Sequence, residues 1–567
     1  MTSIVSPTGT RSGASRREIA SVAVLFGGWI LLLWLLTLRA GAIGIARSDD
    51  WSYLLTQFAF AESGSFVLNN WAVTMLIGQT FAAAPVVATF GNSIAALQAF
   101  VAVLSFLALV AAYVTIRTAT PTRLALFSVG ILAVSPIFGP SVVSFMTDVP
   151  ALFFLSLSLL AGIRALKHSR PHGFYLVLSG VLGLVAFTFR DYAIISFVTV
   201  VVVGLFRVKD SRPRFWLVVA LAAVGAVALL LYSWRHSLPN DLRLEGWPLD
   251  FSMQLVARGL LTVSLLAAPA LATIAWWRLK RPGQRMPLLQ TAAALIVAAA
   301  VAIVAGFELL GNVIHPYGST WLVSGMGIRL WPLWVNRVIL ALAVLCLALA
   351  VYLAWWLVAG LARPRIATLG RWIGRDPAQA SIVLFPLLLL LAHCMATIIL
   401  GTWFIDRYFI LLLPFLAAAL LIVGRQRSVL VARRWTLIPA AVLIIYAAWG
   451  LYVVDFDARF DGSRWKMGQD LAASGYAPQE IDAGMQWVSY HASDVGLGAQ
   501  QVPTRPGRPW WTERYPEQRV CATVVGIDRE QDIPEGAIGV RSVETLFGIK
   551  YFLAAVAGPD SCPDRGG

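Results

Sequence analysis

Residues 21–38 read SVAVLFGGWILLLWLLTL, and this apolar run decides the fold class. A helix needs about 20 apolar residues to cross a bilayer core of about 30 Å, so the run is long enough to span a membrane. The preceding arginines Arg11, Arg16 and Arg17 resemble the start of a signal peptide, but no small-residue cleavage site leads into a soluble domain. We therefore predict an uncleaved first transmembrane helix after a cytoplasmic tail over residues 1–20.

The composition of the whole chain supports a membrane class. Hydrophobic residues make up 59% of the sequence and charged residues 13%, and the mean hydropathy is +0.75. Soluble domains are about half apolar and about a quarter charged, so this composition excludes an ordinary soluble protein. The net charge of +15 would suggest nucleic-acid binding in a soluble chain. Here the basic residues lie in short loops between apolar runs, where they set membrane topology.

Similar apolar runs recur along the chain and predict an all-α polytopic membrane protein. We expect about thirteen transmembrane helices, near 21–39, 94–116, 124–140, 150–166, 173–189, 193–206, 215–233, 258–277, 287–306, 337–360, 380–402, 409–424 and 436–454. Together they form a transmembrane domain over residues 21–454.

The distribution of charge gives the orientation. With the N-terminus inside, the tail and loops on the cytoplasmic side hold 24 basic and 3 acidic residues, the outer loops hold 9 and 10, and the region after residue 454 holds 11 and 16. This asymmetry follows the positive-inside rule and predicts a multi-pass protein of the cell membrane, with residues 455–567 outside the cytoplasm. Residues 71–90 are apolar enough to span, but a span there would place every later basic loop outside. We expect them to lie at the outer interface or to re-enter within the outer loop 40–93.

The polar C-terminal region, residues 455–567, predicts a small extracytoplasmic α/β domain. A helical pattern covers residues 478–491, and residues 522–527 and 551–557 have the pattern of short strands. Cys521 and Cys562 lie in this region, whereas Cys346 and Cys394 lie in spans. We predict a disulfide between the two exported cysteines. No cysteine or histidine spacing indicates a structural metal.

The first outer loop carries the sequence Arg47-Ser48-Asp49-Asp50-Trp51-Ser52-Tyr53. Two adjacent carboxylates just beyond a span are costly near lipid and favour a functional role. A carboxylate at this place can act as a general base on an acceptor hydroxyl. The alternative is that Ser48 and the two aspartates only cap the helix that follows.

Three further residues lie at outer ends of predicted spans. Asp148 precedes Pro150 at the start of a span, which favours either a helix start or an acidic group facing the first loop. Arg190 and Arg407 stand at two other helix ends and are suited to binding phosphate oxygens. The alternative for both arginines is an interfacial Asp–Arg pair beside a tyrosine of the aromatic belt, such as Tyr408.

Taken together, these motifs resemble the GT-C superfamily of polytopic glycosyltransferases, particularly family 39-like and RgtA/B/C/D-like enzymes. The resemblance rests on a paired acidic motif in the first outer loop, an acidic-x-Pro helix start, and an Arg-Tyr run ending in proline near the last core spans. The residues that carry it are Asp49, Asp50 and Tyr53, then Asp148 and Pro150, and finally Arg407, Tyr408 and Pro414.

The resemblance implies an inverting glycosyltransferase that takes a sugar from a polyprenyl-phosphate donor in the membrane and passes it to a glycan, lipid or protein acceptor. The catalytic residues that carry over are Asp49, as the base, and Asp50. The family often has Glu where this chain has Asp50, so the role of Asp50 is less defined. The implied substrate-binding residues, with the arginines on the lipid phosphate, are Tyr53, Asp148, Arg190, Arg407 and Tyr408. No cofactor is implied, although a divalent cation on Asp49, Asp50 and Asp148 stays open.

Two other classes of protein remain as alternatives. A transporter or flippase of a lipid-linked substrate predicts ionisable residues near the membrane midplane and two repeated halves. The acidic groups cluster instead at one face, and no repeated halves are evident. A structural scaffold of the cell envelope would leave Asp49 and Asp50 dispensable.

Overall fold

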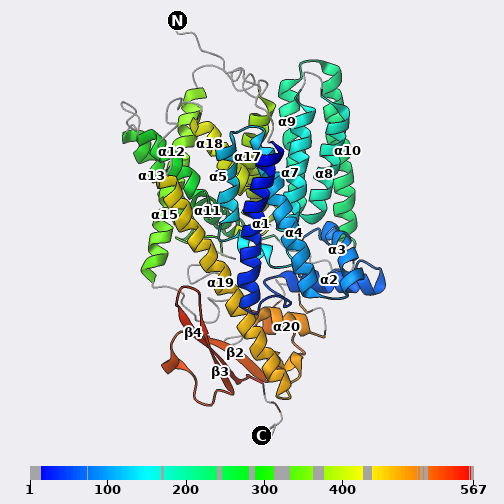
Figure 1. Ribbon diagram of the computed structural model, residues 1–567, viewed down its shortest axis with the longest axis vertical. Coiled ribbons are helices and arrows are strands. Elements are labelled where there is room, and N and C mark those ends of the chain that lie inside the picture. Colours follow the sequence, from blue (N-terminus) through cyan, green and yellow to red (C-terminus); the bar gives the residue numbers. More distant parts are fainter. Residues whose placement is uncertain are drawn as a thin grey trace.

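The computed structural model describes residues 15–72, 74–167, 171–238, 246–279, 288–311, 333–361, 376–425, 437–493, 496–497, 502, 509–560 and 562. A bundle of long helices carries a small sheet at one end, and the Arg16 end of α1 (dark blue) points to the opposite end (Figure 1). The predicted fold class, a helical polytopic membrane protein with a small C-terminal sheet domain, is confirmed.

The bundle contains helices of very different lengths, because loops and prolines interrupt the apolar sequence. Their bounds are α1 Arg16–Arg39, α2 Asp50–Ser63, α3 Ile77–Phe90, α4 Ile94–Arg117, α5 Thr122–Ala133, α6 Phe138–Val142, α7 Asp148–Ala165, α8 Gly173–Phe189, α9 Ile195–Arg207, α10 Ser211–His236, α11 Leu249–Leu266, α12 Ala268–Leu279, α13 Leu288–Val304, α15 Leu333–Leu361, α17 Pro377–Leu400, α18 Leu413–Arg425 and α19 Leu437–Ala473. Two single-turn 3-10 helices, η1 Asp191–Ile194 and η2 Asp406–Ile410, precede α9 and α18.

Within the described ranges, eight helices are long and apolar enough to cross a membrane: α1, α4, α7, α10, α11, α15, α17 and α19. The other five predicted spans correspond to the shorter helices α5, α8, α9, α13 and α18. Two of the predicted helix ranges were wrong because neither forms one continuous helix past its proline. The range 258–277 is split between α11 and α12 at Ala267, and Pro269 lies in the first turn of α12. The range 124–140 stops at Ala133, just before Pro136, since proline cannot continue a helix interior.

Residues 71–90 form no membrane-crossing helix. The helix in this segment, α3, has 14 residues, which extend about 21 Å and fall short of a bilayer core of about 30 Å. It lies beside α2 at the end of the bundle that carries the sheet (Figure 1). The two helices of the predicted outer loop, α2 and α3, therefore both lie at this end of the bundle.

The C-terminal region folds as a four-stranded sheet with order β1-β2-β4-β3, formed by β1 Ile481–Asp482, β2 Ala522–Ile527, β3 Gly539–Glu544 and β4 Lys550–Ala557. β1 and β2 are parallel, and the other pairs are antiparallel. The two predicted strands are confirmed as β2 and β4. The short helices of this region are η3 Pro478–Glu480, α20 Met485–His491, α21 Trp510–Glu513 and η4 Glu530–Asp532.

Two predictions for this region have different outcomes. The continuous helix predicted over residues 478–491 is wrong, because η3, β1 and α20 share that stretch and Gly484 turns the chain with a φ of +96°. The disulfide between Cys521 and Cys562 is confirmed, with a Cα–Cα distance of 5.7 Å. The bond joins the start of β2 to the chain just after its partner β4.

Helix α19 joins the bundle to the sheet without a break. Residue 454, where the sequence places the domain boundary, lies inside this 37-residue helix. Its outer half packs against the sheet and against the chain just after α1. Two glycines allow close contact: a Cβ on Gly450 would lie 2.2 Å from the Val134 carbonyl oxygen, and one on Gly462 would lie 2.3 Å from that of Ala40. The first outer loop is therefore packed directly on α19.

Candidate active site

The Asp49–Asp50 motif lies in a tight turn between the end of α1 and the start of α2. Ser48 has a φ of +51°, a conformation that favours glycine, and the amide of Asp50 donates to the carbonyl of Arg47 at 3.0 Å. Asp49 stands at the N-cap position of α2, yet its side chain forms no capping hydrogen bond there. The capping alternative is therefore wrong for Asp49, and its carboxylate points to other groups.

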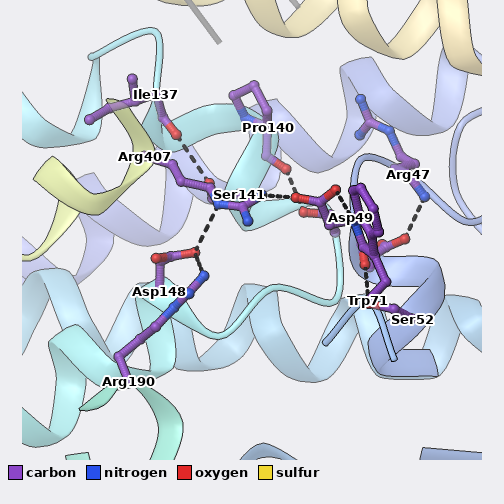
Figure 2. A network of polar contacts seen from close by, with 12 residues as sticks. Arg47, Asp49, Ser52, Trp71, Ile137, Pro140, Ser141, Asp148, Arg190 and Arg407 are labelled. Carbon is purple, nitrogen blue, oxygen red and sulfur yellow. Dashed lines mark hydrogen bonds and ion pairs between the residues drawn. The ribbon is translucent and has the colours of Figure 1, made fainter. Parts of the chain in front are cut away.

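The two oxygens of Asp49 contact two different segments. The Arg407 guanidinium, from η2, donates through Nη1 to Oδ2 at 2.6 Å. The indole N–H of Trp71, from the segment before α3, donates to Oδ1 at 3.1 Å. Figure 2 shows Asp49 between these two donors. Trp71 was not predicted as a site residue.

Asp148, the first residue of α7, lies between two arginines. Its Oδ2 accepts from Nη2 of Arg190 at 2.7 Å, and Nε of Arg407 lies 4.0 Å from the same oxygen. Its other oxygen accepts from the Tyr192 hydroxyl at 3.3 Å. Asp148 is therefore engaged in ion pairing rather than helix capping.

We call Asp49, Arg407, Asp148 and Arg190 the ion-pair chain, because each contacts the next (Figure 2). The structure thus brings together four residues that the sequence predicted separately. Asp49 is its most exposed member: its side chain is 24% exposed, against 5% for Arg407, 0% for Asp148 and 2% for Arg190. Asp49 is therefore the member of the ion-pair chain that a molecule from solvent can reach most easily.

Aromatic side chains surround Arg190, the last member of the ion-pair chain. The Arg190 guanidinium lies over the Tyr408 ring at 5.2 Å, a cation–π distance. Tyr192 contacts Tyr408 at 5.3 Å, and His393 of α17 contacts both rings. Tyr192 and His393 were missed as site residues, although Tyr192 follows Arg190 closely and His393 interrupts an apolar run.

Tyr53 is one turn into α2 and is buried. Burial raises the pKa of its phenol, and the charges of Arg190 and Arg407 act in the opposite direction. The predicted residue Tyr53 therefore lies within the electrostatic reach of the ion-pair chain.

Asp50 is fully buried, and its two oxygens bind backbone amides and not a member of the ion-pair chain. Its Oδ1 accepts from the backbone N–H of Arg47 at 2.5 Å, and its Oδ2 accepts from that of Phe145, just before α7, at 3.0 Å. Burial raises the pKa of this carboxyl to about 7, against the lowering effect of the two backbone donors. Asp50 thus ties the motif to the start of α7, the helix that carries Asp148.

We expect Asp50→Asn to damage the site through folding. An amide offers one acceptor oxygen, so one of the two backbone donors would face an NH₂ group and lose its partner, at a cost of about 1–3 kcal/mol. Thermal unfolding in detergent should show a lower Tm for the variant. An unchanged Tm would show that the two buried contacts do not hold the turn.

Arg47 is a further residue that the sequence did not single out as functional. Its buried guanidinium donates through Nη2 to Asp457 and through Nε to Asp461, both at 3.1 Å, on the outer half of α19. The turn that carries Asp49 is therefore fixed to α7 by Asp50 and to α19 by Arg47.

Asp49, Asp50 and Asp148, the side chains considered for a divalent cation, have other partners among the described residues. Among the described residues, no group of three or more histidine, cysteine or acidic side chains is placed to hold an ion. Asp50 binds backbone amides, and Asp49 and Asp148 are each paired with an arginine. We therefore derive no step through a metal.

Part of the chain matches a known protein family. Residues 77–235 match the sequence profile of a family described as dolichyl-phosphate-mannose-protein mannosyltransferase. This segment runs from α3 into α10 and contains Asp148 and Arg190. The predicted resemblance to polytopic glycosyltransferases is thereby confirmed, and with it the enzyme class, a GT-C type glycosyltransferase of the membrane. Comparison with curated protein sequences gives no match.

The chain is also similar to solved structures at low sequence identity. One is ArnT from Cupriavidus metallidurans bound to undecaprenyl phosphate, with 13% identity, a TM-score of 0.40, and coverage of 95% of this chain and 99% of that one. Another is the oligosaccharyltransferase AglB from Archaeoglobus fulgidus in complex with an inhibitory peptide and a dolichol-phosphate. It shows 13% identity, a TM-score of 0.38, and coverage of 88% of this chain and 69% of that one.

Proposed function

We propose that the protein transfers a sugar from a polyprenyl-phosphate donor to a hydroxyl of an extracytoplasmic glycan, lipid or protein, with inversion at the anomeric carbon. The observation that carries this proposal is the ion-pair chain. It places a partly exposed carboxylate, Asp49, within 2.6 Å of Arg407, which also approaches Asp148, and Asp148 in turn pairs with Arg190. A base and cations for a phosphate are thus neighbours in one site.

In the proposed reaction Asp49 accepts the proton of the acceptor hydroxyl. The hydroxyl oxygen bonds to the anomeric carbon as the bond from that carbon to the phosphate oxygen breaks, and polyprenyl phosphate leaves with the electron pair. A carboxylate has about four acceptor positions, so the bonds from Arg407 and Trp71 leave Asp49 able to take a proton. A general base of this kind contributes about 10²–10⁴ in rate.

The arginines stabilise the leaving phosphate in this scheme. A guanidinium has five donors in a planar fork, so Arg407 can bind Asp49 and still donate to a phosphate oxygen. Asp148 lies between Arg407 and Arg190 and keeps both in place. Preorganised donors of this type stabilise charge where it develops, without moving during the reaction.

The proposed orientation places the ion-pair chain on the extracytoplasmic side. The end of the bundle with the first outer loop also carries the sheet, opposite the Arg16 end of α1 (Figure 1). Basic residues are concentrated in the loops assigned to the cytoplasm, which supports this direction. A donor with its hydrocarbon tail in the bilayer would then present its head group at this end.

The function is tested by supplying purified protein with three radiolabelled donors that carry the same sugar: a polyprenyl phosphate, a polyprenyl diphosphate and a nucleotide diphosphate. We expect transfer, and release of polyprenyl phosphate, from the first donor only. NMR of the product should show the opposite anomer from the donor. Transfer from the nucleotide sugar alone would contradict the proposal, and a retained anomer would contradict the single displacement.

A further inference from the structure

Trp71 connects the proposed base to the C-terminal domain. Its indole N–H donates to Oδ1 of Asp49, while the Arg407 guanidinium donates to Oδ2 of the same carboxylate (Figure 2). A carboxylate bound on one oxygen can still rotate about its last torsion, which has a broad energy profile. Donors on both oxygens fix its plane. Trp71 therefore decides the direction in which Asp49 presents its remaining lone pairs.

The Trp71 ring is itself held by the C-terminal domain. The Trp510 ring of α21 stacks on it, with centroids 5.2 Å apart and planes 19° apart. The Arg514 guanidinium lies 4.7 Å from the centroid of the same ring and 5.4 Å from that of Trp51. Arg514 is fully buried, so these contacts are shielded from solvent.

The neighbour Asn70 binds the same domain at both ends of its amide. Its NH₂ group donates to the Gly496 carbonyl at 2.6 Å, and its oxygen accepts from the Arg514 guanidinium. Two successive residues of the first outer loop, Asn70 and Trp71, thus both contact the C-terminal domain. Neither residue was predicted from the sequence to have a functional role.

We propose that Trp71 is a positioning residue for Asp49 and that the C-terminal domain completes the active site by holding Trp71 through Trp510 and Arg514. This inference rests on the proposed function, in which Asp49 is the base. It makes turnover depend on a docked C-terminal domain, even though that domain supplies no group of the ion-pair chain. Small errors in the placement of a reacting group are expensive, and an error of about 1 Å can cost about 10²-fold in rate.

The direct test is Trp71→Phe in the full chain, which keeps an aromatic ring for stacking and removes the N–H. We expect kcat for sugar transfer to fall about 10-fold or more, with KM for the lipid donor within about twofold of the original. The matched control is Trp487→Phe, which removes the indole N–H bound to the Pro478 carbonyl elsewhere in the C-terminal domain. That variant should keep its kcat.

A double-mutant cycle separates positioning from general structure. If Trp71 acts through Asp49, adding Trp71→Phe to Asp49→Asn should cause no further loss of kcat, whereas a merely structural role gives two multiplying losses. Multiplying losses, or a normal kcat in Trp71→Phe, would overturn the inference. Normal turnover by Asp49→Asn alone would instead overturn the proposed function, so the two failures are distinct.

The role of the C-terminal domain is tested with substitutions in that domain. These variants keep the inference testable even if Trp71→Phe folds poorly. Arg514→Lys keeps the charge but loses the planar group over Trp71, and Trp510→Ala removes the stack that Trp510→Phe preserves. We expect Arg514→Lys and Trp510→Ala to lower kcat with little change in KM, and Trp510→Phe to recover most of it. Normal kcat in both folded loss variants would overturn the coupling.

Discussion

Replacing Asp49 with Asn is expected to lower sugar transfer by about 10²–10⁴-fold, the usual contribution of a general base. The amide has nearly the same volume but cannot accept the proton of the acceptor hydroxyl. Its single oxygen also cannot satisfy both Arg407 and Trp71, which donate to opposite oxygens of the carboxylate. The measurement is transfer from a polyprenyl-phosphate donor, normalised to folded protein.

A suitable control for this variant is Glu62→Gln, in the helix α2 that follows Asp49. Glu62 is exposed and accepts a hydrogen bond from the exposed Asn92 amide at 3.3 Å. The same loss of charge at this place should leave transfer unchanged. Near-normal turnover by Asp49→Asn, with donor binding retained, would remove Asp49 from the mechanism.

Removing the charge of Asp148 is expected to have the largest effect on stability. Arg190 is buried, and its guanidinium binds Asp148 at 2.7 Å. Breaking a buried pair by changing one partner typically costs about 3–5 kcal/mol, because the other charge is left without compensation. Asp148→Asn should therefore lower the Tm in detergent strongly, and Asp148→Asn combined with Arg190→Gln should recover part of the loss.

The exposed pair Lys466–Asp470 provides the matched control. Its atoms approach to 2.8 Å, and Asp470 also pairs with Arg541 at 3.3 Å, yet all three side chains are exposed. Asp470→Asn should change stability by no more than about 1 kcal/mol, as for other surface pairs. Equal Tm losses for Asp148→Asn and Asp470→Asn would show that the ion-pair chain does not carry the buried-charge cost assigned to it.

The sequence predicted those parts of the structure that depend on local patterns. Long apolar runs predicted most of the bundle, and alternation of apolar residues predicted β2 and β4. It failed where one residue overrides a pattern: Pro136 and Pro269 interrupt apolar runs that read as continuous helices, and Gly484 turns the chain inside a helical pattern, so that α20 begins only after it.

Most of the candidate site could also be proposed from the sequence, because charged residues at the ends of apolar spans are rare and conspicuous. Asp49, Asp148, Arg190 and Arg407 were found in this way. The sequence could not show which of them pair, nor that Asp50 binds backbone amides and not a member of the ion-pair chain. The link from Arg514 to Asn70 joins residues 444 positions apart and has no local signal.

Helix α19 has a consequence for how an acceptor reaches the site. Gly450 and Gly462 seat it against the carbonyls of Val134 and Ala40, and a rotation by one residue, about 100°, would replace each glycine with a side chain that has no room. The helix can therefore pack against these two carbonyls in only one rotational position. The sheet packed on its C-terminal half is thereby held beside the turn that carries Asp49, and in the proposed reaction this limits the sides from which an acceptor can reach that carboxylate.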